Sequence, residues 1–194
     1  MLGAPIPIVV GKGGMGWGIG VTPMRAPGDP VKQEGDHKSP AGIFRLGSAF
    51  GYAPQAPDEW KMHYIALTPA TDCVDDPQSR FYNRILDSSA VVPDWKSAEH
   101  MRDAGEAYRW GLVIDHNTGS PKPHGGSCVF MHIWGGAGHG TEGCTAMPEA
   151  QVQSILAWLN PQAKPLLVQM PLRQYRNVEK SLHLPTLPST VVQP

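Results

Sequence analysis

The sequence contains no run of 18 consecutive apolar residues, so we expect no helix that spans a membrane. It also has little net charge: 16 Lys and Arg residues against 17 Asp and Glu residues give a net charge of −1. No stripe of basic residues stands out, so nucleic acid is not an expected partner. The first ten residues lack a positively charged start and a long apolar stretch, so they are not expected to be an intact signal peptide.

Helix-compatible stretches are scarce because glycine and proline are abundant. The 194 residues include 22 glycines and 20 prolines, together about 22% of the chain, which is high but below the level typical of disordered chains. Both residues destabilise helices, so a helical bundle is disfavoured. Hydrophobic residues make up 41% of the chain and include six tryptophans, enough for a packed core. We therefore expect a mainly β protein with short strands, turns and ordered loops.

Apolar and β-branched runs predict the strands, and one helical pattern stands out. The expected strands cover 6–10, 41–46, 63–68, 110–115, 128–134 and 164–170. Residues 72–87 are predicted to form a polar loop, and residues 97–107 a short helix. The clearest helix runs over 148–160, with Pro148 at its first position and an apolar face of Val152, Ile155, Leu156 and Leu159. Since no linker divides the chain, we expect one domain over 1–180 and a proline-containing tail over 181–194.

Residues 11–16, Gly-Lys-Gly-Gly-Met-Gly, match the dinucleotide-binding pattern G-x-G-x-x-G. That chemistry needs a helix to begin at the glycines, so that its N-terminus can hold a pyrophosphate. The residues that follow have no helical period and contain two more glycines. We therefore interpret the segment as a turn between two strands.

Residues 131–147 carry the arrangement that favours catalysis. His132 closes a predicted strand, a glycine-rich loop follows, and Gly143-Cys144 precede the predicted helix. A helix N-terminus near Cys144 would favour its thiolate, and His132 could return through the loop as its base. Gly143 would allow backbone N–H groups to face a developing oxyanion. A single cysteine or histidine is usually structural, so the prediction depends on their occurrence together.

Two segments of the chain, at 38–44 and at 132–146, resemble in their order the L,D-transpeptidase catalytic domain family of the YkuD type. Members carry a strand-end histidine and then Ser/Thr-His-Gly-Cys-x-Arg, which His132 and Thr141–Ala146 match in part. Residues 38–44, Lys-Ser-Pro-Ala-Gly-Ile-Phe, resemble the family's Thr-Pro-x-Gly-x-Phe segment. The matched pieces run from about residue 36 to 160. The resemblance implies a β-sandwich or barrel-like domain with a few short helices packed on the sheet.

The chain departs from the family pattern at three positions. Glu142 replaces the histidine before Gly-Cys, Ala146 replaces the arginine, and Ile133 replaces the glycine after the strand histidine. His139 is a candidate for the missing imidazole. Arg80, Arg84 and Lys38 are candidates for the missing positive charge. Thr141, Glu142, His139 and Arg80 are the substrate-binding candidates.

The resemblance implies a cysteine-dependent acyl transfer on peptidoglycan stem peptides, outside the inner membrane, in the periplasm or another extracytoplasmic space. Cys144 would attack a stem carbonyl, His132 would accept the thiol proton and later protonate the leaving D-amino acid, and the N–H of Gly143 or Cys144 would stabilise the oxyanion. Transfer to an amine gives a crosslink, and transfer to water gives L,D-carboxypeptidase activity. No metal or organic cofactor is required.

Three alternatives stay open. A metal-dependent cell-wall peptidase could draw ligands from His116, His124, His132 and His139, although the sequence has no H-E-x-x-H motif and no tight zinc spacing. A non-catalytic relative could bind peptidoglycan, since Glu142 and Ala146 depart from the pattern. Finally, Cys73 and Cys128 could form a disulfide in an oxidising compartment, but two unpaired, partly buried thiols are the favoured interpretation.

Overall fold

The computed structural model describes residues 4–25 and 28–187. Most of its regular structure is β, which confirms the mainly β prediction. The strands are β1 (Met15–Trp17), β2 (Ser39–Gly51), β3 (Tyr64–Ala66), β4 (Thr71–Val74), β5 (Ile85–Asp87), β6 (Ala98–His100), β7 (Trp110–Ile114), β8 (Phe130–Ile133), β9 (Thr145–Met147) and β10 (Leu166–Gln169). The helices are α1 (Glu149–Trp158) and α2 (Leu172–Val178), with 3-10 turns η1 (Ser88–Ala90), η2 (Met101–Asp103), η3 (Gly105–Tyr108) and η4 (Pro161–Ala163).

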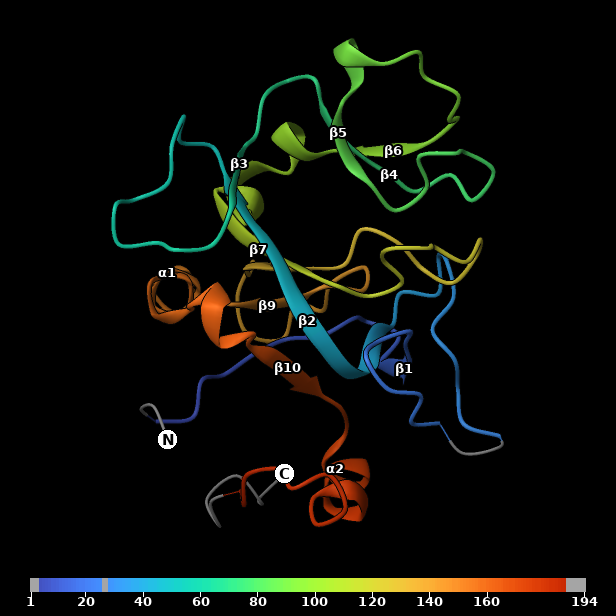
Figure 1. The fold of residues 1–194 in the computed structure, drawn as a ribbon, viewed down its shortest axis with the longest axis vertical. Coiled ribbons are helices and arrows are strands. Elements are labelled where there is room, and N and C mark those ends of the chain that lie inside the picture. Colours follow the sequence, from blue (N-terminus) through green and yellow to red (C-terminus); the bar gives the residue numbers. More distant parts are fainter. Residues whose placement is uncertain (1–3, 26–27, 188–194) are drawn as a thin grey trace.

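The long strand β2 organises the larger sheet and runs diagonally through the molecule (Figure 1). This sheet has seven strands in the order β1-β2-β7-β8-β9, with β10 and β3 also paired to β2. β10 pairs with residues 42–45 of β2 and β3 with residues 49–51. A register shift between Leu46 and Ala49 separates these two halves, so one strand can hold different partners along its length. Among the described residues this strand order is open, and no closed barrel is formed.

A second sheet of three strands, β5-β4-β6, lies above the larger one in Figure 1. Because side chains alternate along a strand, β8 sends Met131 and Ile133 to one face of the larger sheet and Phe130 and His132 to the other. The first face packs against α1, where Val152 and Leu156 are buried, and against the C-cap residue Leu159. On the second face, Phe130 joins a cluster that includes Cys73 of the smaller sheet. The candidate site lies on this second face.

Several predicted elements are confirmed, with shifted ends. Five of the predicted strands overlap observed ones, namely β2, β3, β7, β8 and β10. The helix predicted over 148–160 is α1, and Pro148 is its N-cap residue rather than its first helical residue. Residues 11–14 form a turn that leads into β1, and no helix begins there.

Three predictions are wrong, and one helix was missed. Residues 6–10 form no strand, and only Val9 makes an isolated bridge, to Ala146. The segment 72–87 is a loop only in its middle, because its ends belong to β4 and β5. Residues 97–107 form β6 and the turns η2 and η3, and not a helix. Helix α2 was not predicted, and of the expected tail 181–194 only residues 181–187 lie within the described residues.

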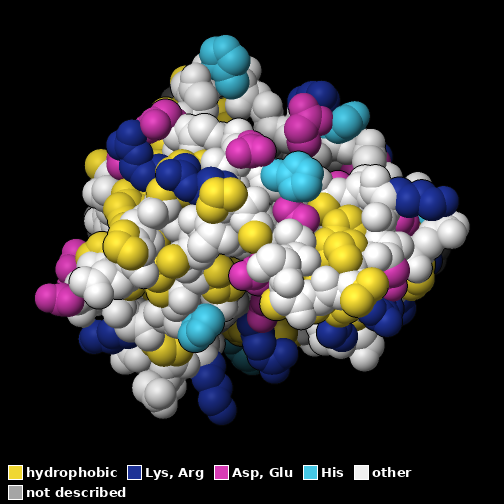
Figure 2. Space-filling model, turned by 90° about the horizontal axis from the view of Figure 1, so that it is seen from above, with side chains coloured by type: hydrophobic (Ala, Val, Ile, Leu, Met, Phe, Trp, Pro, Cys, Tyr) yellow, Lys and Arg dark blue, Asp and Glu magenta, His cyan; other side chains and the backbone are white. Residues whose placement is uncertain are grey.

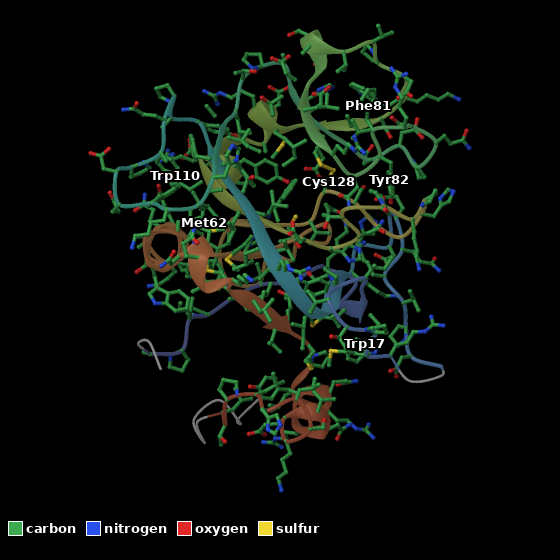
Figure 3. All side chains as sticks on the ribbon, in the orientation of Figure 1. Trp17, Met62, Phe81, Tyr82, Trp110 and Cys128 are labelled. Atoms are coloured by element: carbon green, nitrogen blue, oxygen red, sulfur yellow. A yellow bond between two sulfur atoms is a disulfide. The ribbon has the colours of Figure 1, made fainter. Side chains whose placement is uncertain are left out.

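The favoured interpretation of Cys73 and Cys128 as unpaired thiols is also wrong. The two residues form a disulfide with a Cα–Cα distance of 6.0 Å across a sequence separation of 55. Figure 3 shows the bond beside the labelled Cys128, between the smaller sheet and the larger one. The disulfide therefore ties β4 to the segment that leads into β8, and Cys144 is the free cysteine.

The surface on the side of the smaller sheet mixes Asp and Glu with Lys, Arg and His side chains, and neither sign dominates this face (Figure 2). None of the described helices is both long and apolar enough to cross a membrane.

Candidate active site

Parallel pairing of β8 with β9 sets the position of Cys144. His132 of β8 is opposite Ala146 of β9, and Cys144 precedes β9 directly. Because side chains alternate along a strand, Cys144 and Ala146 face the same side of the sheet as His132. His132 and Cys144 also line the same surface hollow, together with Ala146. The sheet therefore brings the two predicted catalytic residues to one face.

Two hydroxyl groups hold the backbone of Cys144. The Ser39 Oγ donates to the Cys144 carbonyl oxygen at 2.8 Å, and the Thr141 Oγ1 donates to the same oxygen at 2.6 Å. Ser39 also accepts a hydrogen bond from the backbone N–H of Gly11 at 2.8 Å. Ser39 lies in the segment 38–44 that resembles the family's Thr-Pro-x-Gly-x-Phe segment, so the structure places the two motif segments in direct contact.

The thiol of Cys144 is buried, with the residue only 8% exposed. Burial raises the pKa of this thiol to about 12 and the charge of Glu99 acts in the same direction, while the hydrogen bond from the Phe130 N–H lowers it in part. The Phe130 N–H donates to the sulfur at 3.3 Å, and the thiol itself donates to the Cys128 carbonyl oxygen at 3.6 Å. The sulfur is therefore enclosed by polar groups in an otherwise apolar cluster.

The expected assistance from a helix dipole is not present. β9 lies between Cys144 and the first residue of α1, Glu149. An extended strand of three residues covers about 10 Å, and a helix dipole acts mainly within its first turn. The raised pKa of the Cys144 thiol agrees with this correction.

His132 is held in one tautomer. Its Nδ1 lies 2.8 Å from the carbonyl oxygen of Ile133, which can only accept, so Nδ1 carries the proton and Nε2 is free to accept one. Burial lowers the pKa of His132 below the usual 6.5, so the neutral ring dominates at pH 7. Its ring packs edge-to-face on Tyr108 at 5.3 Å between centroids. Among the described residues no hydrogen bond joins His132 to Cys144.

Gly143 occupies a position that other residues tolerate poorly. Its φ is +147°, and a Cβ added there would lie 3.2 Å from the Lys38 carbonyl oxygen. Its N–H donates to the Thr141 Oγ1 at 3.2 Å. Since that donor is used within the loop, the Cys144 N–H is the better candidate for an oxyanion donor.

The structure brings three of the four substrate-binding candidates to one hollow and leaves the fourth outside it. Glu142 is exposed and pairs with Lys12 at 2.6 Å and with the Nδ1 of His37 at 2.5 Å, and its hydrogen bond with Lys12 holds the pKa of its carboxyl below the usual value. His139, Thr141 and Glu142 line the hollow that contains His132. Arg80 lies elsewhere, paired with Asp94 at 3.5 Å, and it lines neither hollow at Cys144.

A second hollow also reaches Cys144, and its lining includes Lys32, Glu99 and Gly143. Lys32 is only 5% exposed, and its ammonium donates to the Gln33 carbonyl oxygen at 2.8 Å and to Asp36 Oδ1 at 2.6 Å. It is thus a positive charge near the nucleophile that the sequence reasoning missed, since it lies in a polar, turn-rich segment without a motif. Lys38 and Arg84, the earlier candidates, line neither hollow.

Glu99 and Tyr108 are the other residues that the sequence reasoning missed. The Tyr108 hydroxyl donates to Glu99 Oε2 at 2.8 Å. Burial raises the pKa of the Glu99 carboxyl to about 7, and the nearby charges of Asp75 and Glu34 act in the same direction. Both residues lie in the segment predicted to be a helix or just beyond it, where nothing marked them as partners of Cys144.

The histidines considered as metal ligands do not converge. No group of three or more His, Cys, Asp or Glu side chains within the described ranges could hold a metal ion. His116 is buried instead in a hydrogen-bonded position, where Nδ1 accepts from the Ile19 N–H at 3.1 Å and Nε2 lies 2.9 Å from the Gly125 carbonyl oxygen. Burial lowers the pKa of His116 to about 4. The structure therefore does not favour the metal-dependent alternative.

We compared the chain with models of protein families, with curated proteins and with solved structures, and none matched. Function is therefore inferred from the site itself. Its geometry offers a single free thiol at the meeting point of two hollows, a neutral imidazole on the same face, and a fixed backbone around the sulfur.

Proposed function

We propose that this protein is a cysteine-dependent acyl transferase that acts on peptidoglycan stem peptides, as an L,D-transpeptidase or, with water as the acceptor, an L,D-carboxypeptidase. The observation that carries the proposal is the contact between the two segments that resemble that family. Ser39, at the start of one segment, donates a hydrogen bond to the carbonyl oxygen of Cys144, in the other, at 2.8 Å. The resemblance and the packing thus agree on one site.

The reaction would proceed through an acyl-enzyme intermediate. The Cys144 sulfur attacks a stem carbonyl as the thiol gives its proton to Nε2 of His132, and the N–H of Cys144 stabilises the oxyanion that forms. The neutral ring of His132, with Nε2 unprotonated, can exchange a proton with the leaving D-amino acid and with the incoming acceptor. The two hollows that meet at Cys144 provide separate approaches for the acyl donor and the acceptor.

The finer features of the fold are part of this proposal. The larger sheet, with α1 on one face and the smaller sheet toward the other, supports a two-layer, sandwich-like catalytic domain. An extracytoplasmic location follows from the proposed substrate, and the Cys73–Cys128 disulfide supports it, because disulfides persist in oxidising compartments.

Turnover of defined stem peptides tests the proposal. The protein is incubated with tetrapeptide-stem muropeptides, and loss of the terminal D-alanine is measured by mass spectrometry. We expect loss with the wild-type protein and none with Cys144→Ala. Equal behaviour of the two proteins would overturn the cysteine mechanism.

A non-catalytic protein that binds peptidoglycan is the second candidate. The raised pKa of the Cys144 thiol, about 12, favours it, because a protonated thiol is a poor nucleophile. In that case muropeptides would bind without being cleaved, and Cys144→Ala would bind them equally well.

A further inference from the structure

Lys32 places a buried ammonium in the hollow that it shares with Cys144. Its Nζ donates to the Gln33 carbonyl oxygen at 2.8 Å and to Asp36 Oδ1 at 2.6 Å. An ammonium carries three N–H donors, and no group within the described part of the chain accepts the third. Because a buried charge is costly unless its hydrogen bonds are made, the third donor points to a bound group that the protein itself does not supply.

Two glycines give this ammonium its place beside the nucleophile. A Cβ added to Gly126 would lie 3.0 Å from Lys32 Cε, and one added to Gly143 would lie 3.7 Å from Lys32 Nζ. Both glycines have a positive φ, +93° and +147°. The lysine side chain therefore lies against both glycines, and its Nζ is close to the backbone that leads directly into Cys144.

The ammonium is held in a fixed position by Asp36. The Asp36 Oδ1 also accepts the backbone N–H of Lys38 at 2.9 Å, and its Oδ2 accepts the backbone N–H of Gln33 at 2.8 Å. The carboxylate that orients Lys32 is therefore itself fixed by the backbone. A donor fixed in advance stabilises a developing charge more than a mobile one, because it need not reorganise during the reaction.

The other charges of this hollow make a cation important for the reaction. Its lining also includes four carboxylates and a histidine, namely Glu34, Asp75, Glu99, Glu142 and His37. Among the described residues that line it, Lys32 is the only Lys or Arg. The charge of Glu99 raises the pKa of the Cys144 thiol, whereas the charge of Lys32 lowers it. Negative charge that develops at Cys144 is thus opposed by the carboxylates and favoured by Lys32.

We propose that Lys32 is a catalytic residue whose third N–H donates, together with the N–H of Cys144, to the carbonyl oxygen that Cys144 attacks. The inference rests on the proposed function, because it takes Cys144 as the acyl-transfer nucleophile. It adds a side-chain cation to the oxyanion site.

Lys32 donates a hydrogen bond in this step and keeps its proton. As the bond between sulfur and the carbonyl carbon forms, the thiol proton moves to Nε2 of His132, and the π electron pair of the carbonyl moves to its oxygen. That oxygen accepts from Lys32 Nζ. When the intermediate collapses, the pair returns to the carbonyl, the bond to the leaving group breaks, and His132 gives its proton to the leaving group.

Two reactions of Cys144 distinguish an oxyanion donor from a general effect on the sulfur. p-Nitrophenyl acetate acylates a thiol through a tetrahedral oxyanion, whereas iodoacetamide alkylates it by direct displacement without one. Cys144 is the free cysteine, so both reactions report on it. The burst of p-nitrophenolate and the intact-mass gain from alkylation are measured at pH 8, and the rates found with Cys144→Ala are subtracted.

The double variant Lys32→Met/Asp36→Asn removes the ammonium together with its carboxylate partner, so neither charge is left buried alone. We expect acylation to be slower by about 100-fold, the usual effect of losing one oxyanion donor. Alkylation should change by less than about 10-fold, which corresponds to one unit in the pKa of the thiol. Lys32→Gln keeps a donor for Asp36 and should show the same selective loss, so it decides the question if the double variant does not fold.

Asp36→Asn and Lys122→Met are the matched controls. Asp36→Asn makes the same change at position 36 but keeps the ammonium, and it should acylate at least as fast as the wild type. Lys122 is an exposed lysine that lines neither hollow at Cys144, and Lys122→Met should react at the wild-type rate in both assays.

An equal loss of acylation and alkylation in the Lys32 variants, or no loss of either, would overturn the proposal. If wild-type protein is acylated no faster than Cys144→Ala, Cys144 is not an acyl-transfer nucleophile, and the proposed function fails as well. If acylation depends on Lys32 while tetrapeptide stems are not turned over, the role of Lys32 stands and the proposed substrate is wrong.

Discussion

Ser39 donates a hydrogen bond to the carbonyl oxygen of Cys144 at 2.8 Å, across a sequence separation of 105 residues. Ser39 is fully buried at the start of β2, and its oxygen also accepts the N–H of Gly11. One hydroxyl therefore ties the N-terminal turn, the longest strand and the nucleophile together.

Replacing this hydroxyl should destabilise the protein. Ser39→Ala leaves the Gly11 N–H without its buried partner, which costs about 1–3 kcal/mol. Urea denaturation measures the change. Ser181→Ala, which removes an exposed hydroxyl bonded to the Val178 carbonyl oxygen, should stay within about 0.5 kcal/mol of wild type. Equal stability of the two variants would mean that Ser39 does not hold the site.

Gly143 should not tolerate a side chain. At a φ of +147°, Gly143→Ala is expected to cost about 1–3 kcal/mol in stability and to slow alkylation of Cys144 by displacing the loop. Gly135→Ala is the control, because a Cβ there meets nothing within 4 Å and its φ is not in the left-handed region. If Gly143→Ala changes neither the stability nor the rate of Cys144 alkylation, glycine is not required beside the nucleophile.

The disulfide should contribute substantially to stability. A link across a sequence separation of 55 is expected to contribute about 4 kcal/mol in the chain-entropy treatment. The free energy of unfolding of the double variant Cys73→Ala/Cys128→Ala should be lower by that amount, so this variant should unfold at a lower urea concentration. A reductant should destabilise the wild type but not the double variant. If reductant has no effect on the wild type under conditions that fully reduce it, the disulfide does not stabilise the fold.

Glu99 should make stability fall as pH rises. Its pKa in the folded protein is about 7, above the ordinary value of 4.5, so the folded state binds the proton more tightly than the unfolded state does. Stability is then greatest when Glu99 is protonated, and it decreases between about pH 4.5 and 7. Glu99→Gln should remove this decrease and be more stable than wild type at pH 8, as measured by urea unfolding at pH 5 and pH 8.

Glu142→Gln is the control variant for the measurement of stability at pH 5 and pH 8. The pKa of Glu142 is lowered by Lys12, so its contribution to stability is present above pH 4.5 and is lost as pH falls through its folded-state pKa. The Glu142→Gln variant should keep the decrease in stability with rising pH that is assigned to Glu99. A wild-type stability that is constant between pH 5 and 8 would contradict the assignment.

The sequence predicted those parts of the fold whose signals are local. The apolar runs of β2, β7 and β8 and the apolar face of α1 are clear because each buries one side against the core. β4, β5 and β6 were missed because they are short and their residues are polar or mixed. β4, for example, is Thr-Asp-Cys-Val, and its strand character comes from pairing with two neighbours.

The candidate site was predicted only in part for the same reason. His132 and Cys144 are marked by glycines and by their order, and strand pairing confirms that they share a face. Tyr108, Glu99 and Lys32 reach the site through tertiary contacts between distant segments, for which the sequence holds no local pattern. The disulfide likewise depends on a Cα separation that only the fold determines.

The central claim, that Cys144 is an acyl-transfer nucleophile, is tested most directly by looking for the covalent intermediate. The wild-type protein is mixed with a tetrapeptide-stem muropeptide, quenched rapidly with acid, digested and examined by mass spectrometry. We expect an adduct on the peptide that contains Cys144, with the mass of the stem lacking its terminal D-alanine, and no adduct in Cys144→Ala. Cleavage of the stem by Cys144→Ala, or an adduct on any other residue, would contradict it.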